Sequence, residues 1–318
     1  MIKPAILSEG DTVGLISPGS YITDDEFNNS VRNLEMLGFN IKPGRFVKNR
    51  YGYFAGTDQE RLTDLHTMFA DENVKAVFCT RGGYGCTRLL PFIDYELIKN
   101  NPKVFIGYSD VTSLLLAINK MTGLVTFHGP VGISNFNHFT TEYFRKILMT
   151  IGNSETELIS EPELKSENSS IPFTIVPGKA EGFLTGGNLS VFVSLIGTEY
   201  EPETENSILF FEETGEEPYR IDRMFTQLIQ SGILSGAAGI ALGTFKNCES
   251  REVNPSFMYS FSLIEVLKER LGIPDIPVVY GLSIGHIKNK LTLPVGMKVE
   301  LDADKKRIFL PEPAVKIE

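Results

Sequence analysis

Short apolar runs alternate with amphipathic segments through the first 130 residues, and this alternation limits the folds open to the chain. Two runs, VKAVFCT at 74–80 and VFIGYS at 104–109, are almost continuously apolar, as strands covered on both faces are. Apolar residues recur at helical spacing over 24–37, 58–70 and 110–121. Strands that alternate with helices in this way predict an α/β fold with an open parallel sheet and helices on both of its faces. Two further strands of this half are predicted at 12–20 and 124–130.

The pattern changes near residue 153. Residues 153–180 are polar, contain proline and lack a clear period, so we predict that they link two domains. The predicted domains are residues 1–152 and a smaller α/β domain at 181–318. In the second half, strands are predicted at 207–212, 237–245 and 277–282, helices at 219–231 and 256–271, and a hairpin that turns at Asp302–Lys305.

Composition excludes several classes of function. The net charge of -10 argues against nucleic-acid binding, and no apolar run approaches the length of a membrane span. The sequence begins without the features of a secretory signal, and its three cysteines match no zinc pattern and are expected to be buried, reduced thiols. We therefore expect a cytoplasmic protein without a metal site.

A serine stands where one predicted strand meets a helix. In FIGYSDVTSLLLAI the strand ends at Ser109 and the helix begins with Asp110. Open α/β sheets place their sites at this edge, and the amide of Asp110 at the helix start can stabilise an oxyanion. Ser109 is thus a candidate nucleophile, although a serine here also suits a plain helix cap. The hydrolase motif G-x-S-x-G is half met, because Gly107 is present but Val111 replaces the second glycine.

A glycine-rich segment, TRGGYGCTR at 80–88, follows the predicted strand at 74–80. Glycines let the backbone approach a ligand closely. A dinucleotide-binding loop is disfavoured, because Arg88 stands where the third glycine of that motif belongs. Two interpretations stay open: a loop that presents an N–H group to an oxyanion, and a tight turn from strand to helix.

Two adjacent acids end the strand that begins at residue 207. Alternation sends Glu212 and Glu213 to opposite faces, so that one enters a cleft while the other meets solvent. A solvated acidic turn is the simpler interpretation. Of the four histidines, His128 lies at the end of a predicted strand and His286 just after one, so both are plausible general bases by placement. His66 is interpreted as a surface or boundary residue, and His138 as part of a polar loop.

Six motifs follow one another over nearly the whole chain: RGGYG at 81–85, GYSD at 107–110, FHGP at 127–130, GGNLS at 186–190, FFEETGEEPYRIDRM at 210–224 and GLSIGH at 281–286. In this order they resemble the LD-carboxypeptidases, a serine peptidase family that includes the microcin C self-immunity peptidases. The resemblance implies a flavodoxin-like N-terminal domain joined to a smaller C-terminal α/β domain, in agreement with the break predicted at 153–180.

The resemblance also implies roles for individual residues. The family's Ser–Glu–His triad corresponds to Ser109, Glu212 and His286, so His286 is selected over His128. The amide of Asp110 is one implied oxyanion donor, and Gly82 or Gly83 supplies the other. By their placement near the proposed site, Arg81 and Arg88 are both candidates for binding a substrate carboxylate, and a structural surface role explains either arginine equally well. The predicted substrate-binding residues are Arg81, Tyr84 and Asn188.

The implied activity removes the terminal D-Ala from a murein tetrapeptide during cell-wall recycling in bacterial cytoplasm, without a metal or cofactor. One alternative is a microcin C immunity-type peptidase that hydrolyses a peptidyl-nucleotide. Those enzymes stack the nucleobase on aromatic residues that include tryptophan, and this chain has no tryptophan. A second alternative is a non-catalytic flavodoxin-like protein that binds an anion. A homodimer is also expected, for which Phe257, Phe261 and Ile264 offer an apolar face that core packing explains equally well.

Overall fold

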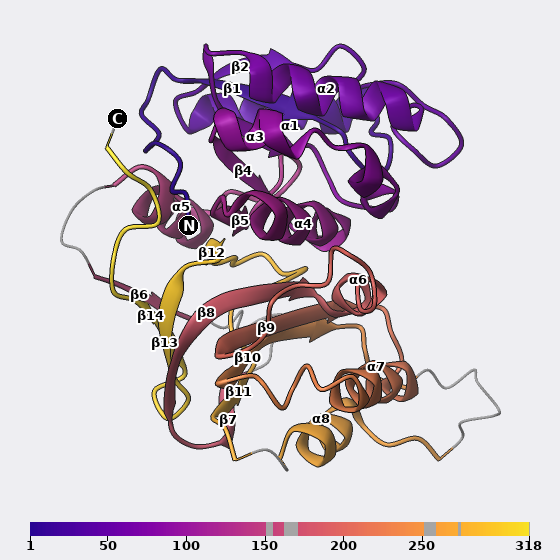
Figure 1. Cartoon of the computed structure of the whole chain (residues 1–318), viewed down its shortest axis with the longest axis vertical. Helices are drawn as coiled ribbons and strands as arrows, with labels where there is room; N and C mark the ends of the chain where they lie inside the picture. The colour runs from indigo at the N-terminus through magenta and orange to yellow at the C-terminus, as the bar shows by residue number, and fades with distance from the viewer. Residues whose placement is uncertain (151–154, 162–170, 251–258, 273–274, 318) are drawn as a thin grey trace.

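The structure is a computed structural model, in which residues 1–150, 155–161, 171–250, 259–272 and 275–317 are described. Two sheets, each with helices beside it, lie one above the other in Figure 1. The two ends of the chain run together, because the backbone amide of Ile6 donates to Lys316 and that of Lys316 donates to Pro4. The first and last segments are therefore joined by main-chain hydrogen bonds.

The first sheet has six strands in the order β12-β5-β4-β3-β1-β2. Strands β2-β1-β3-β4-β5 are parallel and have the flavodoxin-like order, so the predicted fold class is confirmed. The sixth strand comes from the second half of the chain and pairs antiparallel with β5. The bounds are β1 (Thr12–Ile16), β2 (Asn40–Pro43), β3 (Val74–Cys79), β4 (Val104–Gly107), β5 (Thr126–His128) and β12 (Leu293–Val295).

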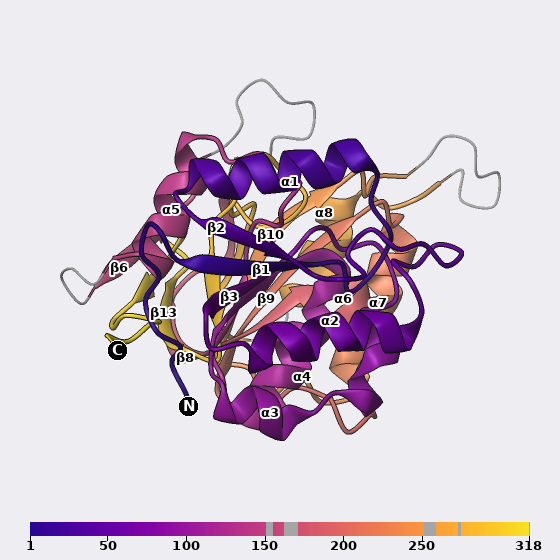
Figure 2. The same cartoon turned by 90° about the horizontal axis from the view of Figure 1, so that it is seen from above.

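Five helices cover this sheet. Figure 2 shows α1 and α5 on one face and α2, α3 and α4 on the other. Thr23 and Thr57 begin α1 and α2 with capping boxes, in which each threonine side chain accepts from a backbone amide three residues on. The bounds are α1 (Asp24–Met36), α2 (Asp58–Ala70), α3 (Tyr95–Asn100), α4 (Thr112–Thr122) and α5 (His138–Leu148), with 3-10 turns at Cys86–Phe92 and Ser109–Val111.

The second sheet has eight strands in the order β6-β14-β13-β8-β9-β10-β11-β7. Strands β8 to β11 are parallel, and the strands outside them pair antiparallel. Its helices α6, α7 and α8 lie together at the right of Figure 1. The bounds are β6 (Thr156–Ile159), β7 (Phe173–Val176), β8 (Lys179–Asn188), β9 (Ser207–Thr214), β10 (Gly239–Lys246), β11 (Val278–Tyr280), β13 (Lys298–Asp302), β14 (Arg307–Leu310), α6 (Leu189–Ser194), α7 (Pro218–Gln230) and α8 (Leu263–Leu271).

Helix α4 lies at the junction of the two sheets. Its sequence TSLLLAI is apolar on nearly every side, and residues 112–118 are all buried. A helix that is hydrophobic all round must be covered on all sides. Strands β8 and β12 contact α4 from the second half of the chain, while β4 and β5 contact it from the first. The turn that precedes α4 is therefore held where the two halves meet.

Several local predictions need correction. The helix predicted at 256–271 begins at Leu263, because Ser262 caps it with Glu265; residues 256–258 lie outside the described residues. Phe261 therefore precedes the helix, and its side chain is exposed. His138 is the first residue of α5 rather than part of a loop, since Asn137 caps that helix. The predicted hairpin is confirmed by the antiparallel pairing of β13 with β14.

The predicted linker contributes to the second sheet. Residues 156–159 form β6, which pairs with β14, and residues 173–176 form β7, which pairs with β11. Both strands are at edges of the sheet, where short and weakly patterned segments are tolerated. Because β12 crosses back into the first sheet, the domain limits at 152 and 181 stay a prediction.

Candidate active site

Ser109 stands at a sharp turn between β4 and α4. Its φ is 64°, a left-handed value that side chains other than glycine rarely adopt. Such strain is characteristic of a serine that a strand-to-helix turn presents at the edge of a sheet. Gly107 is required here, because a Cβ at that position would lie 2.6 Å from Val111 Cγ1. With Val111 in place of the second glycine of the hydrolase motif, the first glycine keeps the turn free of this clash.

The glycine-rich loop packs directly against this serine. A Cβ at Gly82 would lie 2.8 Å from the Cβ and 3.0 Å from the Oγ of Ser109, so only glycine allows this approach. A backbone hydrogen bond also holds this loop, because the amide of Ser20 donates to the Gly82 carbonyl at 3.1 Å. Gly83 has a φ of 97°, and a Cβ there would meet the Ser20 side chain. The two glycines predicted as oxyanion donors therefore lie at the nucleophile or next to it.

The carboxylate of Asp110 holds the glycine-rich loop against the turn of Ser109. Its Oδ2 accepts a hydrogen bond from the Cys86 amide at 2.8 Å, and the side chain is buried. Cys86 begins the 3-10 turn that follows the glycine-rich loop. Asp110 thus ties the end of the loop to the turn that carries Ser109. The sequence analysis predicted a role only for the backbone amide of Asp110. The presence of an acid in the GYSD motif was the one signal that its side chain also has a structural role.

Glu212 and His286 meet across 74 residues of sequence. The His286 Nδ1 lies 2.7 Å from Glu212 Oε2, and the glutamate is fully buried. Gly285 makes the approach possible, because a Cβ there would lie 2.6 Å from the same oxygen. A carboxylate bonded to one imidazole nitrogen orients the ring and leaves the other nitrogen for proton transfer. The two residues therefore have the arrangement of a base and its orienting acid.

The charge state of Glu212 follows from its neighbours. Burial acts to raise the pKa of this carboxyl, but the charge and hydrogen bond of His286 oppose it. The Asn188 side chain adds to that opposing effect, and the net result is a pKa of Glu212 below its ordinary value. Glu212 is consequently ionised at neutral pH, as a group that stabilises an imidazolium must be.

The ring of Tyr108 connects the pair to the nucleophile's turn. Its centroid is 4.9 Å from that of His286, in an edge-on arrangement, and Tyr108 directly precedes Ser109. Burial raises the pKa of Tyr108 to about 12, so the phenol is neutral. The structure thus brings His286 beside the turn that carries Ser109. Sequence reasoning did not single out Tyr108, whose only signal was its place in the GYSD motif.

Glu213 is buried, contrary to the expectation that one acid of the pair meets solvent. Alternation does send it to the opposite face of β9, but that face packs against the start of α6. Its oxygens accept from the Asn188 side chain at 3.0 Å and from the Ser190 amide at 2.9 Å. Burial raises the pKa of Glu213, with the neighbouring Glu212 charge adding to the rise. Glu213 therefore anchors a helix N-terminus.

His128, the other candidate base, is buried behind the site. Its ring lies edge-on to Phe210 at 5.1 Å and to Tyr108 at 6.1 Å. Burial lowers the pKa of His128 to about 4, which keeps the ring neutral. Its Nδ1 is buried and has no hydrogen-bond partner among the described residues. The hydrogen bond to Glu212 Oε2 is made by His286.

Asn188 joins the second sheet to the helix that follows the nucleophile. Its backbone amide donates to the Thr112 Oγ1 at 3.0 Å, and its side-chain oxygen caps α6. Gly187 allows β8 to come this close, since a Cβ there would lie 2.5 Å from the Thr112 side chain. Asn188 is buried and also pairs with Glu212 along β8 and β9. These contacts give it a clear positioning role, and its predicted contact with substrate stays a prediction.

The two arginines differ in their partners. Arg88 makes a bidentate ion pair with Asp58 through Nε and Nη2, so Arg88 has a structural role at the surface. Arg81 contacts Glu26 through Nη1 at 3.3 Å, and its buried Nε has no hydrogen-bond partner within the described ranges. Arg81 is next to Gly82, so its guanidinium is the better placed of the two for a substrate carboxylate. Tyr84, on the same loop, is exposed.

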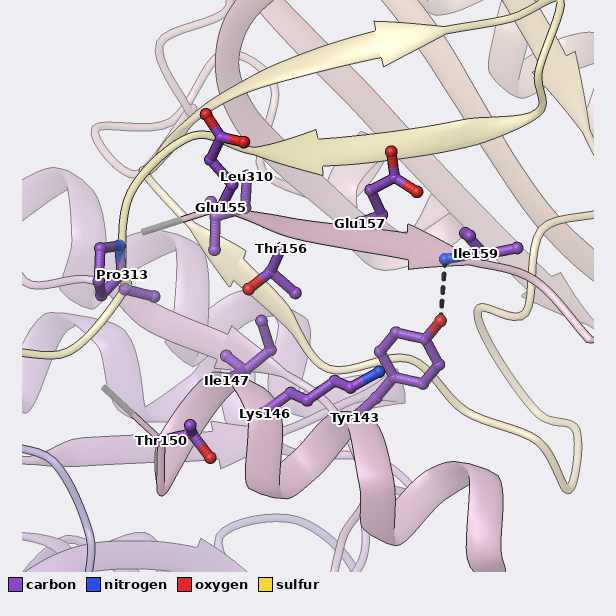
Figure 3. A pocket seen from close by; sticks show the side chains of 11 residues that line it. Tyr143, Lys146, Ile147, Thr150, Glu155, Thr156, Glu157, Ile159, Leu310 and Pro313 are labelled. Carbon is purple, nitrogen blue, oxygen red and sulfur yellow. Dashed lines mark hydrogen bonds between the residues drawn. The ribbon is translucent and has the colours of Figure 1, made fainter. Parts of the chain in front are cut away.

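A cavity of about 580 Å³ lies elsewhere, between α5, β6 and β14 (Figure 3). Its lining includes Tyr143, whose hydroxyl accepts from the Ile159 amide, but none of the predicted site residues. Among the described residues no cluster of three histidine, cysteine, aspartate or glutamate side chains suits a metal ion, and all three cysteines are buried. Within the same residues no helix has the length and apolar character needed to cross a membrane.

Comparison with known proteins places these features in a family. Family models of the LD-carboxypeptidase N-terminal and C-terminal domains match residues 13–129 and 181–301. A probable murein peptide carboxypeptidase of Bacillus subtilis (strain 168) is 42% identical over 96% of this chain and 92% of its own length. The murein tetrapeptide carboxypeptidase of Pseudomonas aeruginosa is 33% identical over 93% and 94%. The solved structure of the microcin C7 self-immunity protein MccF without ligand has a TM-score of 0.89 at 30% identity and covers 99% of this chain and 100% of its own.

Proposed function

Because the chain belongs to the LD-carboxypeptidase family of serine peptidases, we propose that it removes the terminal D-Ala from murein tetrapeptides by hydrolysis at Ser109. The observation that carries this proposal is the hydrogen bond between His286 and Glu212 beside the strained turn of Ser109. The names of the Bacillus and Pseudomonas relatives support the substrate class.

In the proposed mechanism, His286 Nε2 takes the proton of the Ser109 hydroxyl as its oxygen attacks the carbonyl of the diamino acid. Glu212 accepts a hydrogen bond from Nδ1 and stabilises the imidazolium that forms. His286 then gives its proton to the departing amine of D-Ala. Water hydrolyses the resulting acyl-enzyme in a second round of the same proton transfers.

The oxyanion of each tetrahedral intermediate is assigned to backbone N–H groups. The amide of Asp110 lies at the start of the 3-10 turn that leads into α4, where helix amides lack internal partners. The second donor comes from Gly82 or Gly83, on the loop that the Asp110 carboxylate holds in place. Preorganised donors of this kind contribute about 3–4 kcal/mol each to lowering the barrier.

Exopeptidase action requires a group that binds the free carboxylate of the terminal residue. We assign this to Arg81, because its Nε has no partner among the described residues and it adjoins Gly82. A guanidinium binds a carboxylate through two parallel hydrogen bonds, which fixes the distance between the chain end and the scissile bond. This recognition limits cleavage to the last residue.

A microcin C immunity-type activity is the second candidate, supported by the similarity to MccF over nearly the whole chain. The chain has no tryptophan with which to stack a nucleobase, so we favour the murein peptide. We also propose that the protein acts in the cytoplasm, where its buried thiols stay reduced and where cell-wall fragments are recycled.

The test is mass spectrometry of the products from a synthetic murein tetrapeptide. We expect release of D-Ala and a tripeptide, with kcat reduced about 10⁴–10⁶-fold in Ser109→Ala. More than roughly a tenth of the activity left in that variant would exclude Ser109 as nucleophile. A processed microcin assayed in parallel tests the second candidate, and absence of turnover of both substrates would leave only a binding function.

A further inference from the structure

The aromatic ring of Tyr108 is in contact with the proposed base, although no step of the proposed reaction uses it. Tyr108 directly precedes Ser109, and its ring lies edge-on to that of His286, with 4.9 Å between the centroids and 66° between the ring planes. Aromatic rings attract one another at this spacing and angle. A residue bonded to the nucleophile therefore packs against a base that comes from the other half of the chain.

His286 needs such a contact, because one hydrogen bond does not fix its ring. Among the described residues that bond is the one from Nδ1 to Glu212 Oε2, at 2.7 Å. It holds Nδ1 in place but leaves the ring free to tilt about the bond, which would move Nε2 away from Ser109. The His286 side chain is 21% exposed, so it is not enclosed by protein on every side. A second contact on the ring is what limits the tilt.

The segment that carries His286 holds the ring of Tyr108 at a second point. The ammonium group of Lys290, four residues after His286, lies over the Tyr108 ring at 5.4 Å from its centroid, in a cation–π arrangement. The backbone amide of Lys290 donates to Thr140 Oγ1 at 3.0 Å, which attaches this segment to α5. The buried ring of His128 lies edge-on to Tyr108 at 6.1 Å. The Tyr108 ring is thus confined by groups from several elements.

The backbone makes this ring a fixed reference point for the nucleophile. Tyr108 is extended, with φ −153° and ψ −176°, and Ser109 follows with a φ of 64°. The turn has little freedom to relax, since Gly82 and Gly107 are both in positions where a Cβ would clash with it. Any shift of the Tyr108 ring would therefore change the position of His286 relative to the Ser109 hydroxyl.

We propose that Tyr108 is a positioning residue, whose ring holds the imidazole of His286 in line with the hydroxyl of Ser109. This inference rests on the proposed function of the same site. The ring carries the role and the phenol hydroxyl does not, because the contacts with His286 and Lys290 are made by the ring. Since these contacts exist without substrate, their loss should lower kcat and leave KM nearly unchanged. A misplacement of reacting groups by about 1 Å lowers the rate about 100-fold.

The test compares Tyr108→Leu with Tyr108→Phe in the release of D-Ala from the tetrapeptide. We expect Tyr108→Leu to lower kcat about 10–100-fold with KM within about threefold of wild type. Tyr108→Phe keeps the ring and should retain at least about a third of kcat. Tyr143→Leu is the matched control, because Tyr143 is a buried tyrosine that packs against Phe139 at 4.7 Å and lines the cavity away from the predicted site residues. It should leave kcat unchanged.

Proton NMR of the protein without substrate gives a second readout. The proton shared by His286 Nδ1 and Glu212 resonates far downfield, and its signal is assigned by its loss in His286→Gln. We expect Tyr108→Leu to broaden this signal, because the ring of His286 becomes more mobile. Tyr108→Phe and Tyr143→Leu should preserve it.

Three kinetic results would overturn the inference. A kcat of Tyr108→Leu within about threefold of wild type would show that the ring does not position the base. A higher KM at unchanged kcat would make Tyr108 a substrate contact, and an equal loss in Tyr108→Phe would assign the role to the hydroxyl. Absence of D-Ala release by the wild type is instead a failure of the proposed function. The NMR signal then decides alone, and an unchanged signal in Tyr108→Leu would overturn the positioning role.

Discussion

Replacing Glu212 by Gln tests the proposed catalytic pair most directly. The side chain is fully buried, and its Oε2 lies 2.7 Å from His286 Nδ1. Gln has nearly the same volume, so the packing around Gly285 is retained. Its amide group, however, can donate to Nδ1 and so favour the imidazole tautomer that cannot accept the proton of Ser109. It also removes the negative charge that stabilises the imidazolium.

We expect kcat to fall about 10³–10⁴-fold, as when the acid of other triads is replaced by its amide. At 1.36 kcal/mol for each factor of ten, this corresponds to about 4–5 kcal/mol of lost transition-state stabilisation. KM should change little, because Glu212 does not contact substrate in the proposed mechanism. The assay is the initial rate of D-Ala release from the tetrapeptide, with circular dichroism to verify folding.

Glu213→Gln is the matched control. Glu213 is the next residue on the same strand and is equally well buried, but it binds Asn188 and the start of α6. Its replacement should lower the free energy of unfolding by about 1 kcal/mol through weaker hydrogen bonds and leave kcat within about threefold. If Glu212→Gln retained more than a tenth of the wild-type kcat, or if both variants lost it equally, the assignment of Glu212 would be wrong.

Three further predictions follow from the contacts. Arg81→Ala should raise KM for the tetrapeptide about 10–100-fold with little change in kcat, and an equal effect of Arg88→Ala would refute the assignment of Arg81. Thr112→Val leaves the buried Asn188 amide without its acceptor and should cost about 1–3 kcal/mol in urea unfolding, whereas Thr112→Ser should not. Burial raises the pKa of Asp64 to about 6, so the wild type loses stability as its carboxyl ionises between pH 4 and 6. The stability of Asp64→Asn relative to wild type should therefore rise by roughly 2 kcal/mol over that interval, and a constant difference would contradict this sign.

The parallel sheet could be predicted because its signals are local. Continuous apolar runs such as 74–80 indicate strands covered on both faces, and the helix predicted at 58–70 has the same limits as α2. Where the local signals were weaker, the predicted secondary structure was wrong. The polar appearance of His138 hid a helix that Asn137 caps, and residues 156–159 have too little periodicity to indicate the edge strand β6. Edge strands need less apolar sequence, because only part of their surface is buried.

The candidate site likewise has some features that local sequence predicts and others that it does not. The sequence by itself determined the strand-to-helix junction at Ser109 and the glycine-rich loop after the neighbouring strand, since both follow from the order of residues along short segments. Placement alone left His128 and His286 equal as bases, and only the resemblance to a family separated them. Alternation along the strand predicted that Glu212 and Glu213 point to opposite faces. It did not predict that Glu212 binds His286 while Glu213 binds the start of α6.

The tertiary structure decided which distant groups meet. It put His286 on Glu212 across 74 residues, buried Glu213 against α6, and brought β12 back to the first sheet. No local pattern encodes such pairings, because they depend on how whole elements pack and on the entropy of closing the long loops between them. The sequence determined which segments could carry the chemistry. The packing of β8 and β12 against α4 decided that the second half of the chain lies beside the turn of Ser109, since an all-round apolar helix must be covered on every side.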